Sequence, residues 1–346
     1  MRIIVDAMGG DNAPLAIIKG ALRGQKRWGV DITLAGDEAA IRDALSQCGV
    51  SELPQGMDIV PTTEEVTMED DPATVFRRKK DSSMGVGLTL LRDGKGDAFI
   101  SAGSTGALLT GATLITKRIR GIRRAAMAPV MPTTTGRCVL IDCGANAECT
   151  PEYLLQFAYL GSFYASHVLG IENPRVGLLN NGAEETKGRE LQKEAYALLK
   201  DAGEKGLVNF VGNVEARDVP LGAVDVVVCD GFNGNVLLKT IEGTAMFMGS
   251  LMKKMFKKNL LSKLGYLLCA SGVKDLMKML DYREIGGTPF LGIRKPVIKA
   301  HGASDMLAFR NAVKQAADVA ASDITGELEE NLQRLAAEKE KVTEHD

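Results

Sequence analysis

The sequence lacks several features that other classes of protein require. No uninterrupted apolar stretch of the 346 residues reaches the ~18 residues expected of a spanning helix. The apolar part of the N-terminal segment is too short for the core of a signal peptide. The formal net charge of −2 argues against nucleic-acid binding driven by overall charge. We therefore expect a cytosolic protein that is soluble, or that lies on a membrane without crossing it.

Cysteine is scarce, and its spacing excludes two kinds of site. The cysteines lack the close pairs of a zinc site and the framework of a small disulfide-rich domain. Aspartates stand mostly singly, one per loop, so we expect no metal site and no cofactor. We predict that the cysteines are reduced, buried thiols. They are Cys48, Cys138, Cys143, Cys149, Cys229 and Cys269.

Short apolar runs alternate with helical patterns along most of the chain. The valine-rich run at 224–228 does not alternate with polar residues, which is typical of a strand buried on both faces of a parallel sheet. The pattern predicts an α/β fold with a mostly parallel central sheet, as one large unit or two lobes. Strands are expected at 3–5, 31–35, 57–60, 97–100, 139–142, 176–179, 224–228 and 293–300, with helices at 38–47, 153–169 and 306–322 among those between and after them.

A loop rich in glycine and asparagine, DGFNGN at 230–235, follows the valine-rich strand. Helix-forming residues resume at Val236, so backbone N–H groups and a helix dipole could both face an anion. A tight turn in which glycine only supplies positive φ explains the segment equally well. The candidate ligands here are Asp230, Asn233, Gly234 and Asn235.

Similar polar loops follow other predicted strands. Because the carboxyl ends of parallel strands lie along one edge of a sheet, this repetition predicts a shared anion-binding cleft. The loop SAGSTGA at 101–107 resembles neither GxGxxG nor GxxxxGK(S/T), so dinucleotide-binding and P-loop NTPase functions lose their main support. The further candidates are Asp6, Gly9, Gly10, Ser104, Thr105 and Asn146.

Two cationic or titratable residues stand out within these loops. Lys187 lies near a predicted helix start, where a cation opposes the helix dipole, so it is a better ligand candidate than a surface lysine. His301 follows the last predicted strand beside Gly302. A lone histidine is often structural, but this position makes a catalytic role equally reasonable. Asp6 and Asp11 could bind substrate or brace their turn, and bracing is favoured for Asp11.

Four consecutive cations follow a turn at Asp71-Pro72. Such a run is usually a solvated helix face. The functional alternative is a landing patch for an acidic partner. The cations are Arg77, Arg78, Lys79 and Lys80, called the 77–80 cluster below.

A basic segment with apolar residues occupies positions 243–282. It has no acidic residue between Glu242 and Asp275, and its lysines alternate with leucine and methionine. This composition is typical of a basic amphipathic helix or helical pair that could lie on an anionic membrane. Packing on the body, or a dimer seam, is the alternative. Membrane contact would fall on Leu251, Met255, Leu260 and Leu261. The charged tail at 331–346 carries no recognisable chemistry.

Eight segments, taken together and in order, resemble the bacterial acyl-ACP:phosphate acyltransferase family of phospholipid synthesis (PlsX-type). The match runs from residue 1 to about residue 320, with minor substitutions at Cys143, Cys229 and Thr288. The segments are MRIIVDAMGGDNAP, DDPATVFRRKKDSSM, SAGSTGALLTGA, LIDCGANAE, GLLNNGAEETKG, VVVCDGFNGNVLLKTIEG, GGTPFLGI and PVIKAHGASD.

The resemblance implies a fold, an assembly and a reaction. It implies a cytosolic homodimer, loosely associated with the membrane, with a three-layer α/β/α fold like isocitrate and isopropylmalate dehydrogenases and phosphotransacetylases. Residues 1–330 would form the catalytic domain, with 243–282 as a helical insertion. The reaction would move a long acyl chain from acyl carrier protein to inorganic phosphate. The acidic carrier protein could dock on the 77–80 cluster or on the lysine-rich helices.

The residues are compatible with that chemistry. Phosphate is largely dianionic at neutral pH and is its own nucleophile, so the site must seat it, stabilise an oxyanion and assist the departing thiolate. The loop glycines, hydroxyls and amides, with Lys187, suit the first two tasks. His301 or Lys187 could assist the departing thiolate, with Asp230 and Asp6 orienting these two side chains. The alternatives are a CoA-dependent phosphotransacetylase or a dehydrogenase on the same fold, and a non-catalytic scaffold that docks on membranes.

Overall fold

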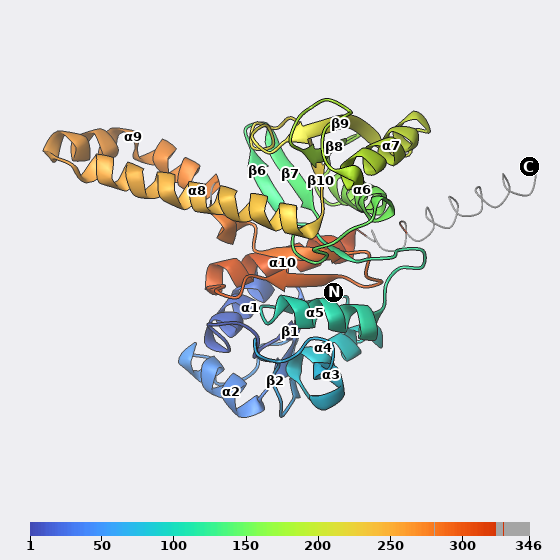
Figure 1. Cartoon of the computed structure of the whole chain (residues 1–346). Coiled ribbons are helices and arrows are strands. Elements are labelled where there is room, and N and C mark those ends of the chain that lie inside the picture. The colour runs from blue at the N-terminus through green and yellow to red at the C-terminus, as the bar shows by residue number, and fades with distance from the viewer. Residues whose placement is uncertain (280, 323–327, 329–346) are drawn as a thin grey trace, which may run out of the picture.

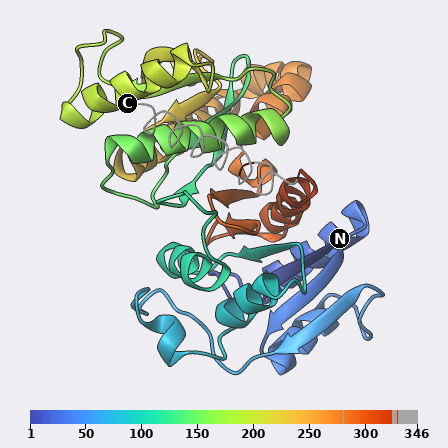
Figure 2. The ribbon, with the colours of Figure 1, turned by 90° about the vertical axis from the view of Figure 1, so that its right-hand side faces the viewer.

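Two mostly parallel sheets, with helices on both of their faces, make up the protein (Figure 1). The computed structural model describes residues 1–279, 281–322 and 328. The predicted α/β architecture is confirmed, and its strands divide between two sheets that form the lower and upper lobes in Figures 1 and 2. The charged tail expected at 331–346 lies outside the described residues.

The seven-stranded sheet has the order β3-β2-β1-β4-β12-β11-β5. Its first five strands in this order are parallel, and β11 runs antiparallel to both β12 and β5. The carboxyl ends of β1, β4 and β12 therefore meet at one edge. The strands are β1 (Arg2–Asp6), β2 (Asp31–Gly36), β3 (Met57–Pro61), β4 (Ala98–Ser101), β5 (Ala126–Met127), β11 (Gly287–Leu291) and β12 (Val297–Ala300).

Alternate residues of β1 show why this sheet needs helices on both faces. Ile3 and Val5 belong to the cluster that contains residues of α1 (Leu15–Trp28) and α10 (Met306–Ala321). Ile4 belongs to the cluster formed with α4 (Ser83–Arg92). All three side chains are fully buried, as the run of β-branched residues predicts. Gly20 lets α1 approach α10, because a Cβ there would lie 2.7 Å from Phe309 Cβ.

The five-stranded sheet has the order β6-β7-β10-β8-β9, with only β6 antiparallel to its neighbour. Val226 and Val228 pack in the same cluster as α6 (Pro151–His167), whereas Val227 packs with Leu237 of α8 (Gly231–Lys257). The strands are β6 (Val130–Thr133), β7 (Gly136–Ile141), β8 (Arg175–Asn180), β9 (Asn209–Glu215) and β10 (Val226–Val228).

Helices α8 and α9 (Leu260–Met279) form a pair that projects from the body (Figure 1). Helices were predicted for this region, and α9 buries none of its residues. Within the described residues, no helix is both long enough and apolar enough to span a bilayer. The remaining helical segments are α2 (Glu38–Gln47), α3 (Val75–Arg78), α5 (Thr105–Gly111), a π-helix (Ala112–Thr116), α7 (Glu190–Glu204) and a 3₁₀ turn (Tyr282–Glu284).

Two local predictions were wrong. The DGFNGN segment is not a loop before a helix at Val236, because α8 begins at Gly231 with Asp230 as its N-cap. Cys269 is exposed on α9 rather than buried, while Cys138, Cys143 and Cys229 are buried as predicted and the other two cysteines are half-buried.

Candidate active site

A buried carboxylate joins the loops that follow β1 and β4. Asp6 accepts hydrogen bonds from Ser83 Oγ at 2.7 Å and from Ser101 Oγ at 2.6 Å. The backbone N–H of Gly9 also donates to Asp6 Oδ1, at 3.1 Å. Burial raises the pKa of Asp6 above its ordinary value, against these hydrogen bonds. Its oxygens are thus engaged within the protein, so Asp6 braces the loops.

The loop after β12 closes against the loop after β1. Asp11 N–H donates to Gly302 O at 2.9 Å, and Asn12 Nδ2 donates to Ala303 O at 3.3 Å. Gly10 has φ of 105°, and a Cβ there would lie 3.0 Å from Gly302 O. Gly10 is therefore required by backbone conformation and close approach. The three loops form one unit at the carboxyl edge of the larger sheet.

A buried lysine, which sequence reasoning missed, lies beneath these loops. Lys299 of β12 is 7 % exposed, and its Nζ donates to Ala102 O at 3.2 Å and also to Ala300 O. Burial lowers its pKa to about 8, while the nearby Asp11 and Asp6 charges act in the opposite direction. A charged residue inside an otherwise apolar strand was the signal that could have revealed it.

The smaller sheet carries a second brace, Asp142, directly after β7. Its carboxylate accepts from the N–H groups of Met127 at 2.8 Å, Cys143 at 2.7 Å and Asn146 at 2.6 Å. Burial raises the Asp142 pKa. Asn146 Nδ2 donates to Asp142 at 3.0 Å and to Ala125 O at 2.8 Å, so this predicted substrate ligand is held inside the loop. Asp142 itself was missed, although an aspartate after a buried strand is the signal that singled out Asp6.

The N-terminus of α8 packs directly on this loop. Asp230 caps the helix by accepting from Asn233 N at 2.9 Å and Asn233 Nδ2 at 2.6 Å. Gly231 N donates to Asn146 O at 2.7 Å. These donors therefore stabilise the helix start instead of facing a cleft. The amide of Asn235 is exposed and lies close to Gly144.

His301 follows β12 directly and keeps an exposed face. Partial burial lowers its pKa, the charge of Lys239 lowers it further, and Glu242 raises it. Lys239 and Glu242 form an ion pair of 3.0 Å on α8. The same two charges act on the buried Cys143 thiol after β7. The N-terminal end of α8 lies between the upper and lower lobes in Figure 1.

The protonation of His301 follows from these contacts. Its Nδ1 lies 3.2 Å from the N–H of Ala303 and accepts from it. With a pKa below the ordinary value, the ring is neutral at neutral pH, and its proton then resides on Nε2. His301 is thus a neutral imidazole with an N–H donor.

The structure places the predicted hydroxyl ligands at a helix start. Ser104 is the N-cap of α5, and its Oγ accepts from Ala107 N at 3.4 Å. Thr105 is the first residue of α5 and is half-buried. Ser104 stabilises the helix through this bond, whereas Thr105 lies next to the braced loops of β1 and β4.

Lys187 lies in the exposed loop after β8, at the same sheet edge as the N-terminus of α8. Its described contacts are within its own loop, where Asn180 Nδ2 donates to Lys187 O at 3.1 Å and Lys187 N donates to Glu184 O at 3.1 Å. The shared cleft predicted from the sequence would place Lys187 near His301, and this stays a prediction.

The 77–80 cluster lies at α3 among carboxylates. Lys79 pairs with Asp70 at 2.6 Å, and Arg78 donates to Thr74 Oγ1 at 2.7 Å. The surrounding segment 64–81 carries six acidic residues against these four cations. The acidic residues are Glu64, Glu65, Glu69, Asp70, Asp71 and Asp81.

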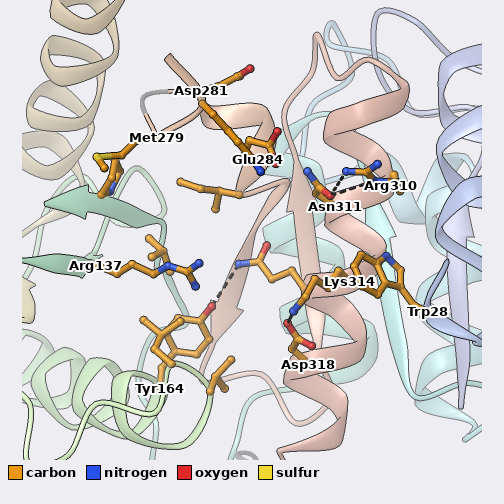
Figure 3. A pocket seen from close by; sticks show the side chains of 18 of the residues that line it. Trp28, Arg137, Tyr164, Met279, Asp281, Glu284, Arg310, Asn311, Lys314 and Asp318 are labelled. Carbon is orange, nitrogen blue, oxygen red and sulfur yellow. Dashed lines mark hydrogen bonds and ion pairs between the residues drawn. The ribbon is translucent and has the colours of Figure 1, made fainter. Parts of the chain in front are cut away.

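A cavity of about 650 Å³ lies away from these loops (Figure 3). It is lined from α1, the start of β7, the end of α6, α9 and α10, and Gln315 Nε2 donates to Tyr164 Oη there at 3.3 Å. Among the described residues, none of the predicted site residues lines it. In residues 1–279, 281–322 and 328, no group of three or more His, Cys, Asp or Glu side chains is placed to hold a metal ion.

Comparison with known proteins identifies the family. A family model described as "Fatty acid synthesis protein" matches residues 1–326. The phosphate acyltransferase of Thermoanaerobacterium thermosaccharolyticum is 47 % identical over 335 residues, which cover 97 % of this chain and 98 % of that protein. The phosphate acyltransferase of Alkaliphilus oremlandii is 48 % identical over 335 residues, with the same coverage of both chains. The chain belongs to this family. The resemblance carried by the eight sequence segments is confirmed, and this member of the phosphate acyltransferase family is an acyltransferase.

Solved structures show the same fold at low identity. The EutD phosphotransacetylase from Staphylococcus aureus has a TM-score of 0.58 at 16 % identity, covering 92 % of this chain and 94 % of that one. A 4-hydroxythreonine-4-phosphate dehydrogenase from Klebsiella pneumoniae has a TM-score of 0.54 at 14 % identity, covering 92 % and 99 %. These likenesses confirm the fold class that the sequence predicted.

Proposed function

We propose that this acyltransferase moves a long-chain acyl group from acyl carrier protein to inorganic phosphate, and that the acyl phosphate formed serves phospholipid synthesis. The match to the family over residues 1–326 carries the proposal, and it is supported by the charges of Lys239 and Glu242 on α8, which act on both His301 after β12 and Cys143 after β7. A phosphate and a thioester carbonyl could approach each other at this junction.

The reaction needs few protein groups. A phosphate oxygen attacks the thioester carbonyl carbon, the new C–O bond forms, and the carbonyl electron pair moves to oxygen. The oxyanion then collapses, the C–S bond breaks, and the thiolate leaves and takes up the proton that the attacking hydrogen phosphate releases. Preorganised donors that stabilise such an oxyanion are commonly worth a factor of about 10² to 10³ in rate.

His301 and Lys187 have complementary roles in this proposal. A neutral imidazole donates from Nε2 without carrying a charge of its own, which suits the oxyanion and then the leaving sulfur. Lys187 would neutralise phosphate from the β8 loop. Thr105 and Asn235 would complete the phosphate seat, because the other predicted amides and hydroxyls are hydrogen-bonded within the protein.

Product formation tests the proposed function. The full chain is incubated with acyl-acyl carrier protein and labelled phosphate without added metal, and acyl phosphate is trapped with hydroxylamine. We expect product from this pair and little from acetyl-CoA. Product from acetyl-CoA alone would indicate a phosphotransacetylase, and no product from either would favour a non-catalytic scaffold. If His301→Ala and Lys187→Ala both keep wild-type kcat/KM for phosphate, the site assignment is wrong.

Helices α8 and α9 support two further parts of the proposal, membrane docking and a homodimer. Leu260 is 81 % exposed and Leu261 79 % exposed at the tip of the pair, while Leu251 and Met255 are exposed along α8. Five lysines between 253 and 263 would add at most roughly 5 kcal/mol near an anionic surface, enough for reversible docking. We propose a cytosolic protein that docks reversibly on membranes through this tip and pairs with a second copy.

Vesicle sedimentation and ultracentrifugation separate these two roles. Leu251→Glu/Leu260→Glu protein should lose binding to anionic vesicles, and equal binding by both proteins would contradict membrane docking. Sedimentation velocity of the wild type should show a dimer, and a monomer at all concentrations would contradict the homodimer.

A further inference from the structure

A second cationic segment, at 117–124, contains more cations than the 77–80 cluster and has no acidic residues near it in the sequence. Its eight residues, KRIRGIRR, include five cations, and no acidic residue occurs from position 98 to 141. We propose that this segment, with Arg294 and Lys295, forms the docking surface for the acidic carrier protein that delivers the acyl thioester. The proposal rests on the function proposed above. The five cations are Lys117, Arg118, Arg120, Arg123 and Arg124.

Buried anchors hold the segment in a fixed shape. Ile119 is 2 % exposed and Ile122 5 % exposed, whereas Arg120, Arg123 and Arg124 are exposed residues. A preorganised surface of this kind loses little conformational entropy when a partner binds.

The fold adds charges from a distant part of the chain. Ile119 N donates to Gly292 O at 3.0 Å, and Arg294 N donates to Lys117 O at 3.0 Å. These bonds place residues 292–295 beside the basic segment. Positions 285–304 also contain no acidic residue. Seven cations therefore lie on two adjoining segments.

The basic segment 117–124 differs from the 77–80 cluster in its ion pairs. Within residues 1–279, 281–322 and 328, none of the five cations of 117–124 forms an ion pair. By contrast, the 77–80 cluster has its Lys79–Asp70 pair and an excess of carboxylates around it. A carrier protein rich in Asp and Glu would meet a positive field at 117–124 and a mixed one at 77–80.

The surface adjoins the candidate active site. Asn146 Nδ2 donates to Ala125 O at 2.8 Å, so the residue after Arg124 is bonded to the β7 loop that Asp142 braces. The Arg124 guanidinium lies over the Tyr153 ring at 5.7 Å, and Arg123 N donates to Gln156 Oε1 at 2.9 Å on α6. A protein bound here would hold its flexible thioester arm next to the strand-end loops.

Other occupants fit this surface less well. A second copy of the chain would present the same cations, and like charges facing each other oppose association. A lipid surface would engage the apolar helices α8 and α9, which project on the side of the body opposite to the teal-to-green chain that follows α5 in Figure 1. An acidic protein satisfies both the charge and the position.

A charge-reversal pair tests the surface. Arg120→Glu/Arg123→Glu changes two exposed side chains outside the catalytic loops, and Arg77→Glu/Lys80→Glu is the matched control. Binding of holo-acyl carrier protein to the full chain is measured by calorimetry at low and high salt. We expect Kd to rise about tenfold or more at low salt in the first variant, with a smaller effect at high salt, and to change little in the control.

Kinetics and lipid binding separate the outcomes. With acyl-pantetheine in place of the carrier-bound substrate, the Arg120→Glu/Arg123→Glu protein should keep wild-type kcat/KM. Wild-type Kd for the carrier protein in this variant would overturn the surface, as would a loss of binding to phosphatidylglycerol vesicles without any loss of carrier binding. If wild-type protein binds the carrier through this surface but forms no acyl phosphate, the proposed function fails and the surface stands.

Discussion

Ser101 Oγ donates to Asp6 Oδ2 at 2.6 Å and so ties the ends of the neighbouring strands β4 and β1. Asp6 is 1 % exposed and also accepts from Ser83 of α4. Asp142 has the corresponding position in the smaller sheet, where it holds the backbone after β7. In both sheets, a buried carboxylate fixes the loops that border the candidate active site. Such a network is rigid only while every donor is satisfied.

The first prediction concerns this brace. In Asp6→Asn the side chain keeps its shape but turns one acceptor oxygen into a donor, which leaves Ser and backbone donors unpaired. We expect a loss of about 2–4 kcal/mol in the free energy of unfolding, measured by urea denaturation, with a large fall in kcat. Asp11→Asn, on the exposed turn beyond, should change stability by less than about 0.5 kcal/mol. Equal losses in both variants would contradict the bracing role.

The second prediction concerns the junction of the two sheets. Removing the positive charge with Lys239→Met should raise the His301 pKa, and removing the negative charge with Glu242→Gln should lower it further. NMR titration of the imidazole Cε1 proton measures both, with His301→Gln to assign the signal among the three histidines. A His301 pKa unmoved by either substitution would show that α8 does not lie against the β12 loop.

The third prediction concerns pH and the buried Lys299. Its pKa is 10.5 in an exposed lysine and about 8 in the folded protein, so between these values the unfolded state binds more protons. Stability should therefore be lowest below pH 8 and rise as pH increases towards 10.5, by about 3 kcal/mol relative to Lys299→Met. Denaturant unfolding of both proteins across this range measures the difference. If the stability of the two proteins changed with pH in the same way, folding would not lower the pKa of the Lys299 amine.

The order of strands and helices could largely be predicted, because each depends on local patterns. The prediction of a helix at Glu38–Gln47 matches α2, where an apolar stripe follows the capping residue Asp37. Strands β5, β6, β9 and β11 were missed. The short β5 and the polar β9, with sequence NFVGNVE, lack a strong apolar run. The division into two sheets was left open, because pairings between distant strands leave no local pattern.

The candidate site was harder to predict, because its aspartates look alike in sequence. Asp6 and Asp230 follow apolar strands and were both taken to orient catalytic residues, although bracing its turn was also open for Asp6. The bracing role of Asp6 depends on Ser83 and Ser101, which are 77 and 95 positions away in the chain. Asp230 instead bonds to Asn233 within its own helix. Whether a polar group is satisfied inside the fold depends on contacts that spacing does not reveal.

The fourth prediction compares two glycines of α8. A Cβ at Gly234 would lie 2.0 Å from the carbonyl oxygen of Asp142, whereas a Cβ at Gly243 would have no neighbour within 4 Å. Because the backbone of a braced loop cannot move aside, Gly234→Ala should destabilise the protein by about 3 kcal/mol or more and lower kcat/KM. Gly243→Ala should instead stabilise it by about 0.5–1 kcal/mol through helix propensity, with activity unchanged. Denaturation midpoints and steady-state rates of the two variants measure the contrast. Similar stability changes in the two proteins would mean that the start of α8 is not seated on the Asp142 loop, and the junction of the two sheets would lose its main contact.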